Sequence, residues 1–184
     1  MKRLRTRKFT TEKQKQLAKE YLQSLQTTGV PSTDIFVAHF DGCCEPVNPG
    51  GNMGVGAVIK QNGKKLFQYS HFIRAKPHNT NNVAEYLGME AILDFIISNE
   101  WEGRILTVYG DSKLVIEQLF GTWKVRGGLY VPFFVSCKNK LAQARAMNNS
   151  IDGIWIPREQ NFDADTLSKQ ELIDNNVQFK LQKL

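Results

Sequence analysis

The order of strand and helix patterns narrows the possible folds of this chain more than any other property of its sequence. Residues 35–41 form a near-continuous apolar run, as expected for a central strand that is buried on both faces. Two further strand patterns, over 55–60 and 65–74, lie on either side of Asn62-Gly63, a dipeptide typical of a tight hairpin turn. The sheet is therefore expected to start with three antiparallel strands.

The remaining part of the body alternates between helices and strands. Helical spacing of apolar residues and short apolar runs predict six more elements. These are a helix over 80–98, a strand over 105–110, a helix over 112–120, a helix from about 133 to 144, a strand over 151–156 and a helix over 161–169 that Asn161 caps. The order predicts an α/β fold with a mixed five-stranded sheet, first antiparallel and then parallel, and helices on both faces.

Positive charge is concentrated before this body. The chain has a formal net charge of +6, and residues 1–34 hold eight Lys or Arg against three acids, a net of +5. A capping box at Thr11 and Gln14, followed by apolar residues at helical spacing, predicts a basic amphipathic helix there. We expect an extension over 1–34, a main domain over 35–172 and a tail over 173–184. The basic extension either binds a polyanion or docks on the body, and both roles are compatible.

Cysteine usage and hydropathy bear on the compartment. The chain has three cysteines and no CxxC pair, which argues against a disulfide framework and against a zinc site. No apolar run is long enough to span a membrane, and no signal-peptide pattern follows the basic N-terminus. We therefore expect a cytoplasmic protein without a membrane span, working as a monomer.

Four carboxylates occupy the ends of predicted elements, namely Asp41, Glu85, Asp111 and Asp165. Taken singly, each has a structural explanation as a turn former, a helix cap or a charge at a helix N-terminus. Neighbouring strands would bring them together, and like charges that close repel by about 4 kcal/mol at an effective dielectric constant near 20. Mg²⁺ or Mn²⁺ would relieve this repulsion, and a pair of such ions about 4 Å apart suits in-line phosphoryl displacement. The sequence thus predicts a metal-dependent nuclease.

Five segments around these acids, in the same order, resemble type I ribonuclease H, and in particular its archaeal-type branch. The resemblance covers about residues 35–170. The segments are FDGCCEPVNPGG (40–51), TNNVAEY (80–86), GDSKLVI (110–116), GTWKV (121–125) and WIPREQNFDADTLS (155–168). The resemblance implies a ribonuclease H-like fold and an endonuclease that cuts the RNA strand of an RNA–DNA hybrid, leaving 5′-phosphate and 3′-hydroxyl ends.

The resemblance also implies roles for individual residues. Asp41, Glu85, Asp111 and Asp165 would hold two Mg²⁺ ions, with Mn²⁺ as a possible substitute. The implied substrate contacts are the backbone of Gly42, Cys43 and Cys44 and the side chain of Asn82 near 2′-hydroxyls, and Asn48 and Thr80 against the strands. Further implied contacts on the substrate face are Asn81, Trp123, Lys124 and Arg158.

The chain departs from many bacterial members of that family in two places. Arg158 and Glu159 replace a His-bearing loop, and Lys124 and Arg126 are all that remains of a basic protrusion. We expect the basic segment 1–34 to supply the missing affinity.

Other activities of the same fold are alternatives. Proofreading exonucleases need an Asp-x-Glu pair where this chain has Asp41-Gly42-Cys43, and integrases lack the Thr-Asn-Asn run that precedes Glu85. A reverse transcriptase fragment is a further alternative. So is a module that binds hybrid or double-stranded RNA with little or no cleavage, and cleavage of double-stranded RNA is also open.

Overall fold

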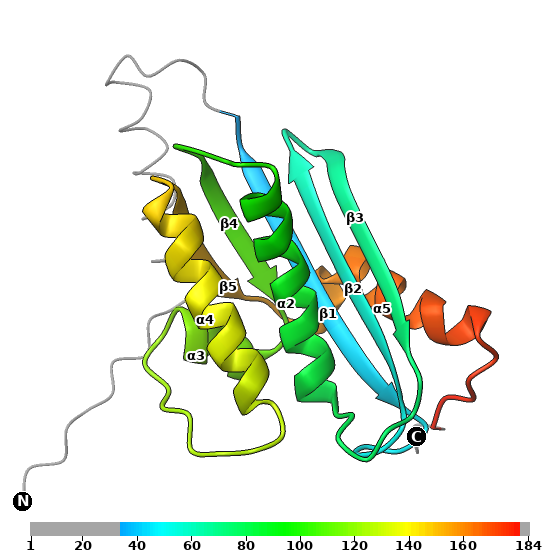
Figure 1. The fold of residues 1–184 in the computed structure, drawn as a ribbon. Coiled ribbons are helices and arrows are strands. Elements are labelled where there is room, and N and C mark those ends of the chain that lie inside the picture. Colours follow the sequence, from blue (N-terminus) through cyan, green and yellow to red (C-terminus); the bar gives the residue numbers. More distant parts are fainter. Residues whose placement is uncertain (1–33, 181–184) are drawn as a thin grey trace, which may run out of the picture. The chain divides into compact units, whose positions relative to one another are not determined.

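The computed structural model describes residues 34–180, so the helix predicted within 1–34 and its capping box at Thr11 and Gln14 lie outside the described residues. The described chain forms a five-stranded sheet in the order β3-β2-β1-β4-β5 (Figure 1). The strands are β1 (Phe36–Glu45), β2 (Asn52–Gln61), β3 (Lys64–Ile73), β4 (Ile105–Gly110) and β5 (Ser150–Trp155). The helices are α2 (Asn81–Ser98), α3 (Lys113–Leu119), α4 (Val131–Ala146) and α5 (Phe162–Asp174), and a 3₁₀ turn, η1 (Arg158–Gln160), precedes α5.

The strand directions confirm the predicted sheet. Strand β2 is antiparallel to both β1 and β3, whereas β4 is parallel to both β1 and β5. The hairpin between β2 and β3 turns at Asn62 and Gly63, whose φ angles of 50° and 80° are both positive. Asn and Gly tolerate that conformation better than other residues, so the dipeptide located the hairpin correctly.

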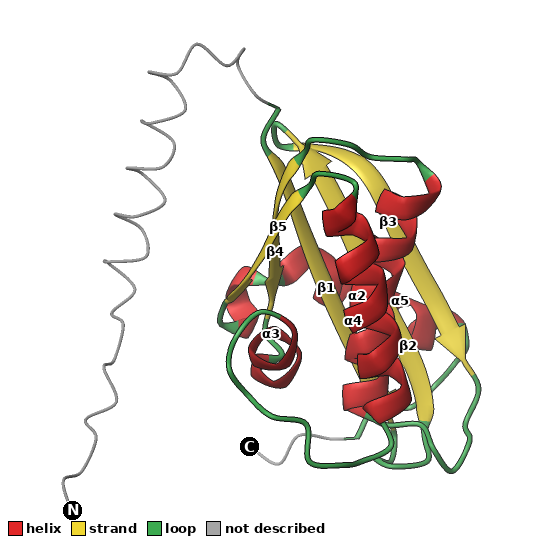
Figure 2. Ribbon diagram, turned by 60° about the vertical axis from the view of Figure 1, so that its left-hand side comes forward, coloured by secondary structure: helices red, strands yellow, loops and turns green. Residues whose placement is uncertain are grey.

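Helices cover both faces of the sheet, again as predicted. Helices α2 and α4 lie on one face and α5 lies on the other (Figures 1 and 2). The main core lies under α2, where Tyr86, Met89 and Leu93 are fully buried. Ala84, Leu87, Ala91 and Phe95 recur at helical spacing along α2; Ala84 is fully buried, and the other three are partly buried and pack against the core. The helix buries more than this one stripe because it packs against β1 on one side and α4 on another.

Strand β1 continues past its predicted end at Asp41. Its parallel pairing with β4 stops at Phe40 and Gly110, while its antiparallel pairing with β2 continues to Glu45. The strand persists because Cys44, which is 3% exposed, keeps the alternation of β1 and packs in a second small core beside β2. Asp41 therefore lies within β1, at the point where β4 ends.

Two close contacts between backbones bring helices α2 and α5 beside Asp41. A Cβ atom on Gly42 would lie 2.2 Å from the carbonyl carbon of Ala84 in α2, and one on Gly56 would lie 2.4 Å from the carbonyl oxygen of Ala164 in α5. Only glycine lets the backbones come so near. Glu85 and Asp165 each follow the helical alanine at these contacts, so both acids are brought to the same stretch of β1 and β2.

The helices in the described part of the chain pack on the two faces of the sheet. Among residues 34–180, no helix combines the length and hydropathy needed to cross a membrane. All three cysteines are free thiols, as the sequence predicted.

Candidate active site

The sheet places Asp41 and Asp111 side by side. Phe40 and Gly110 are paired across the parallel strands β1 and β4, and each is followed directly by one of the two acids. Glu85 comes from the second turn of α2 and Asp165 from the first turn of α5. The four predicted acids therefore come from four different elements.

Electrostatic coupling shows that the four acids share one region. Burial raises the pKa of Asp41, and the charges of Asp111 and Asp165 raise it further against a hydrogen bond from Ser168. Burial also raises the pKa of Glu85 to about 8, with further increases from Asp41 and Asp111 that oppose a hydrogen bond from Ser112. At neutral pH Glu85 is therefore mostly protonated in this arrangement.

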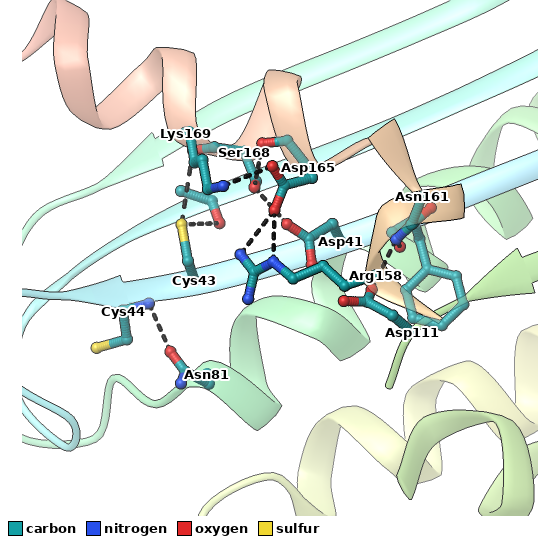
Figure 3. A network of polar contacts seen from close by, with 12 residues as sticks. Asp41, Cys43, Cys44, Asn81, Asp111, Arg158, Asn161, Asp165, Ser168 and Lys169 are labelled. Atoms are coloured by element: carbon teal, nitrogen blue, oxygen red, sulfur yellow. Dashed lines mark hydrogen bonds and ion pairs between the residues drawn. The ribbon is translucent and has the colours of Figure 1, made fainter. Parts of the chain in front are cut away.

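Two cationic side chains neutralise Asp165. Arg158 donates to Asp165 Oδ1 from Nη2 at 2.6 Å and from Nε at 3.0 Å, and Lys169 Nζ lies 2.6 Å from Oδ2. Arg158 reaches from η1 past Asp41 and Asp111 to make this contact (Figure 3). Burial lowers the pKa of Arg158, but the hydrogen bond and charge of Asp165 outweigh it, so the guanidinium remains charged beside the acids.

The four acids lie in one region but do not form a complete set of metal ligands there. Within the part of the chain that the structure describes, no three His, Cys, Asp or Glu side chains are grouped closely enough to hold a metal ion. The predicted cage is therefore incomplete here, because Asp165 is directed to Arg158 and Lys169. The donor set is made of carboxylate oxygens, which suits a hard divalent cation, and a cation there would relieve the repulsion that raises the pKa of Asp41 and Glu85.

Hydroxyl and amide groups hold three of the acids, and sequence reasoning did not find them. Ser112 donates to Glu85. Ser168 donates to Asp41, and Asn161 donates to Asp111 (Figure 3). The available signal was that all three residues lie inside segments that also carry an acid. Asn161 is the N-cap residue of α5, as predicted, but its side chain makes no capping bond and donates to the backbone of β1 instead.

The predicted substrate-contacting residues at the start of α2 form one connected network. Asn81 Oδ1 accepts from the backbone N–H of Cys44 at 2.7 Å, and Asn48 Oδ1 accepts from the N–H of Asn81 at 3.2 Å. Thr80 caps the helix, since its Oγ1 accepts from the N–H of Val83. The turn after β1 is thereby fixed to the N-terminus of α2. Asn82, which follows this network, is partly exposed.

The other predicted contact residues surround this region less tightly. Burial raises the pKa of Cys43 to about 11, so its thiol is neutral and its backbone is the chemically useful part. Trp123 is 46% exposed, and the Lys113 ammonium lies 5.9 Å from its ring centroid. Lys124 is exposed after α3. Trp155 donates from Nε1 to the backbone oxygen of Asp111 at 2.9 Å.

The mixed five-stranded sheet, with helices on both faces and acids that converge from four elements, defines the ribonuclease H fold. A family model described as "Reverse transcriptase-like" matches residues 39–171, and the chain belongs to this ribonuclease H-like family.

Curated proteins from mycobacteria are similar to part of the chain. The "Bifunctional protein Rv2228c" of Mycobacterium tuberculosis is 37% identical over 94 residues, which is 50% of this chain and 24% of the relative. The chain thus spans about a quarter of the length of the curated relatives it matches.

Solved structures match more fully. The N-terminal RNase H domain of that mycobacterial protein, fused to maltose binding protein, is 31% identical with a TM-score of 0.65, covering 78% of this chain and 97% of that one. RNase H1 from the archaeon Halobacterium salinarum is 26% identical with a TM-score of 0.61, covering 76% and 98%. LC11-RNase H1 in complex with an RNA/DNA hybrid is 26% identical with a TM-score of 0.63, covering 77% and 99%.

Proposed function

We propose that this chain is an endonuclease that hydrolyses the RNA strand of RNA–DNA hybrids in a two-metal reaction, leaving 5′-phosphate and 3′-hydroxyl ends. The observation that carries the proposal is the convergence of four acids from β1, α2, the end of β4 and α5, two of them with raised pKa values. The similarity to LC11-RNase H1, which was solved with an RNA/DNA hybrid, supports the choice of substrate.

The residues of the chain have separate parts in this reaction. Two Mg²⁺ ions, or Mn²⁺ in their place, would stabilise the attacking and leaving oxygens of the displaced phosphoryl group. Asp41 and Asp111 offer oxygens from adjacent strands, and Glu85 loses its proton when it serves as a ligand. Arg158 and Lys169 neutralise Asp165 in the protein alone and would compete with a cation for its oxygens.

The hydrogen-bond network that joins the turn after β1 to α2 would select the RNA strand by binding its 2′-hydroxyls. A 2′-hydroxyl both donates and accepts, so backbone groups at Gly42 to Cys44 and amides at Asn81 and Asn82 are suitable partners for it. Asn81 already holds the N–H of Cys44 at 2.7 Å, which keeps this part of the backbone in one position. Thr80, at the N-terminus of α2, would lie at a phosphate of the DNA strand.

A second candidate is a module that binds hybrid or double-stranded RNA with little or no cleavage. One observation favours it, namely that Asp165 already has a cationic partner on each of its oxygens. We propose further that the chain belongs to the archaeal-type branch, because Arg158 stands where many bacterial members carry a His-bearing loop. A cytoplasmic location and a monomeric state stay predictions from the sequence, as does the division at residues 34 and 172.

Cleavage of matched duplexes tests the proposal. RNA–DNA, RNA–RNA and DNA–DNA duplexes of one sequence are incubated with the chain in Mg²⁺, beside Asp111→Asn and the control Asp152→Asn, whose side chain is exposed on β5. We expect cutting of the RNA strand of the hybrid alone, a loss of more than about 100-fold in Asp111→Asn and no loss in the control. Equal cutting of all three duplexes, or full activity of Asp111→Asn, would contradict the proposal. Binding of hybrid without cleavage would favour the second candidate.

A further inference from the structure

We propose that Asn161 is a positioning residue whose side chain fixes two of the four acids, Asp41 and Asp111, a role that rests on the proposed nuclease function. Asn161 lies between η1 and α5 and is fully buried, with 0% of its surface exposed. Nothing in its predicted role as a helix cap requires such burial, because its side chain makes no capping bond.

Asn161 makes three hydrogen bonds near the acids, two from its side chain and one from its backbone. Its Nδ2 donates to Asp111 Oδ1 at 2.7 Å and to the backbone oxygen of Phe40, the residue before Asp41, at 2.9 Å. Its own backbone oxygen accepts from the N–H of Asp165 at 3.0 Å. One residue thus connects β1, the end of β4 and the first turn of α5 (Figure 3).

The chemistry of these contacts fixes the orientation of the amide. The carbonyl of Phe40 and the carboxylate of Asp111 are both acceptors, so the NH₂ group must face them. The same orientation turns Asn161 Oδ1 towards the partly buried ring of His39: burial lowers the pKa of His39, and a side-chain hydrogen bond with Asn161 opposes that shift. A flip of the amide would therefore lose the contact with His39 and set its oxygen against two acceptors.

The two donors constrain the acids that a divalent cation would bind. Rotation of the Asp111 carboxylate, or separation of Phe40 from the end of β4, would break a bond to a side chain that cannot move within the packed interior. Hydrogen bonds that orient carboxylate ligands commonly change metal affinity or activity by about 10- to 100-fold when they are removed. Asn161 is expected to act through Asp41 and Asp111 in this way, without touching the substrate.

The chain supplies a matched control in Asn149. That residue is also buried, at 7% exposure, and its Nδ2 also donates to two backbone oxygens, those of Trp101 at 2.6 Å and Ala144 at 2.9 Å. It precedes β5, at the end of the sheet opposite to the one where Asp111 follows β4. Asn149→Ala therefore removes a comparable buried amide without disturbing the acids.

The test compares Asn161→Ala, the isosteric Asn161→Asp and Asn149→Ala in the full chain. Calorimetric titration with Mn²⁺ in the absence of nucleic acid reports metal affinity, steady-state cleavage of hybrid in Mg²⁺ separates kcat from KM, and thermal unfolding reports stability. We expect both Asn161 variants to bind Mn²⁺ about 10- to 100-fold more weakly and to lose kcat while KM for the hybrid stays within about twofold. Asn149→Ala should lose thermal stability and keep the wild-type affinity and kcat.

Each other outcome is decisive. Wild-type Mn²⁺ affinity and kcat in both Asn161 variants would overturn the proposal, and so would loss of folding in both while Asn149→Ala folds, because the role would then be purely structural. A wild-type chain that binds Mn²⁺ but cuts no duplex would refute the proposed function, while the titration would still report on Asn161. A wild-type chain that binds no Mn²⁺ would refute both.

Discussion

Replacing Glu85 by glutamine should stabilise the metal-free protein at high pH. The pKa of Glu85 is raised from 4.5 to about 8, chiefly by burial, so the folded protein binds a proton there that the unfolded chain releases. Stability from this group is fully present below pH 4.5 and is lost as the pH rises through about 8. The substituted amide would not titrate and could still accept from the hydroxyl of Ser112.

The magnitude follows from the proton affinity. A tenfold change in proton affinity corresponds to about 1.36 kcal/mol, so the full difference in pKa represents about 5 kcal/mol. Glu85 is partly exposed, so contact with water lowers the free-energy cost of ionising it in the folded protein. We therefore expect Glu85→Gln to raise the free energy of unfolding at high pH by about 2 to 4 kcal/mol relative to the wild type. Urea unfolding in EDTA at pH 5, 6, 7 and 8 measures it for the wild type, Glu85→Gln and the exposed control Glu102→Gln.

We expect the advantage of Glu85→Gln over the wild type to grow steadily between pH 5 and 8, and the control to follow the wild type. Parallel stability profiles of Glu85→Gln and the wild type across this range would refute the reasoning. They would mean that Glu85 is ionised in the folded protein at neutral pH and that the crowding of acids at β1 costs nothing.

Three further changes should have measurable effects. Gly56→Ala should lower the free energy of unfolding in urea by about 3 kcal/mol, because its Cβ would lie 2.4 Å from a backbone oxygen of α5; an unchanged value would contradict the close approach. Lys169→Met should lower the Mg²⁺ concentration for half-maximal cleavage by up to about fivefold, since an exposed ion pair contributes at most about 1 kcal/mol; a higher midpoint would show that Lys169 assists cation binding. Deleting 1–34 should raise KM for the hybrid and flatten its salt dependence with kcat nearly unchanged; an unchanged KM at several salt concentrations would exclude a role in binding.

The fold was predictable because its signals are local. The positive φ angles at Asn62 and Gly63 follow from residue type, and the apolar runs located all five strands. The end of β1 could not be predicted from local sequence. Gly42 and the residues after it resemble a turn, and it is their pairing with β2 that makes them part of the strand. The full buried surface of α2 also depends on a distant part of the chain, because α4 covers a second side of the helix.

The candidate site was predictable where a motif carried it. The four acids could be selected because each lies in a segment that resembles a known family. The partners of these acids are distant in sequence: Asn161 is 50 residues from Asp111, and Ser168 is 127 residues from Asp41. Asn at the start of a helix most often caps it with its side chain, so the pattern around Asn161 predicted the N-cap position correctly and the side-chain contacts wrongly.

Anomalous scattering from crystals of the chain grown with an RNA–DNA hybrid and soaked in Mn²⁺ tests the central claim most directly. The claim is that folding gathers carboxylates from four elements into a binding site for paired divalent ions. We predict two Mn²⁺ peaks about 4 Å apart, ligated by Asp41, Glu85, Asp111 and Asp165, with Arg158 displaced from Asp165. Peaks elsewhere, or Asp165 still held by Arg158 and Lys169 in the presence of hybrid and metal, would contradict it.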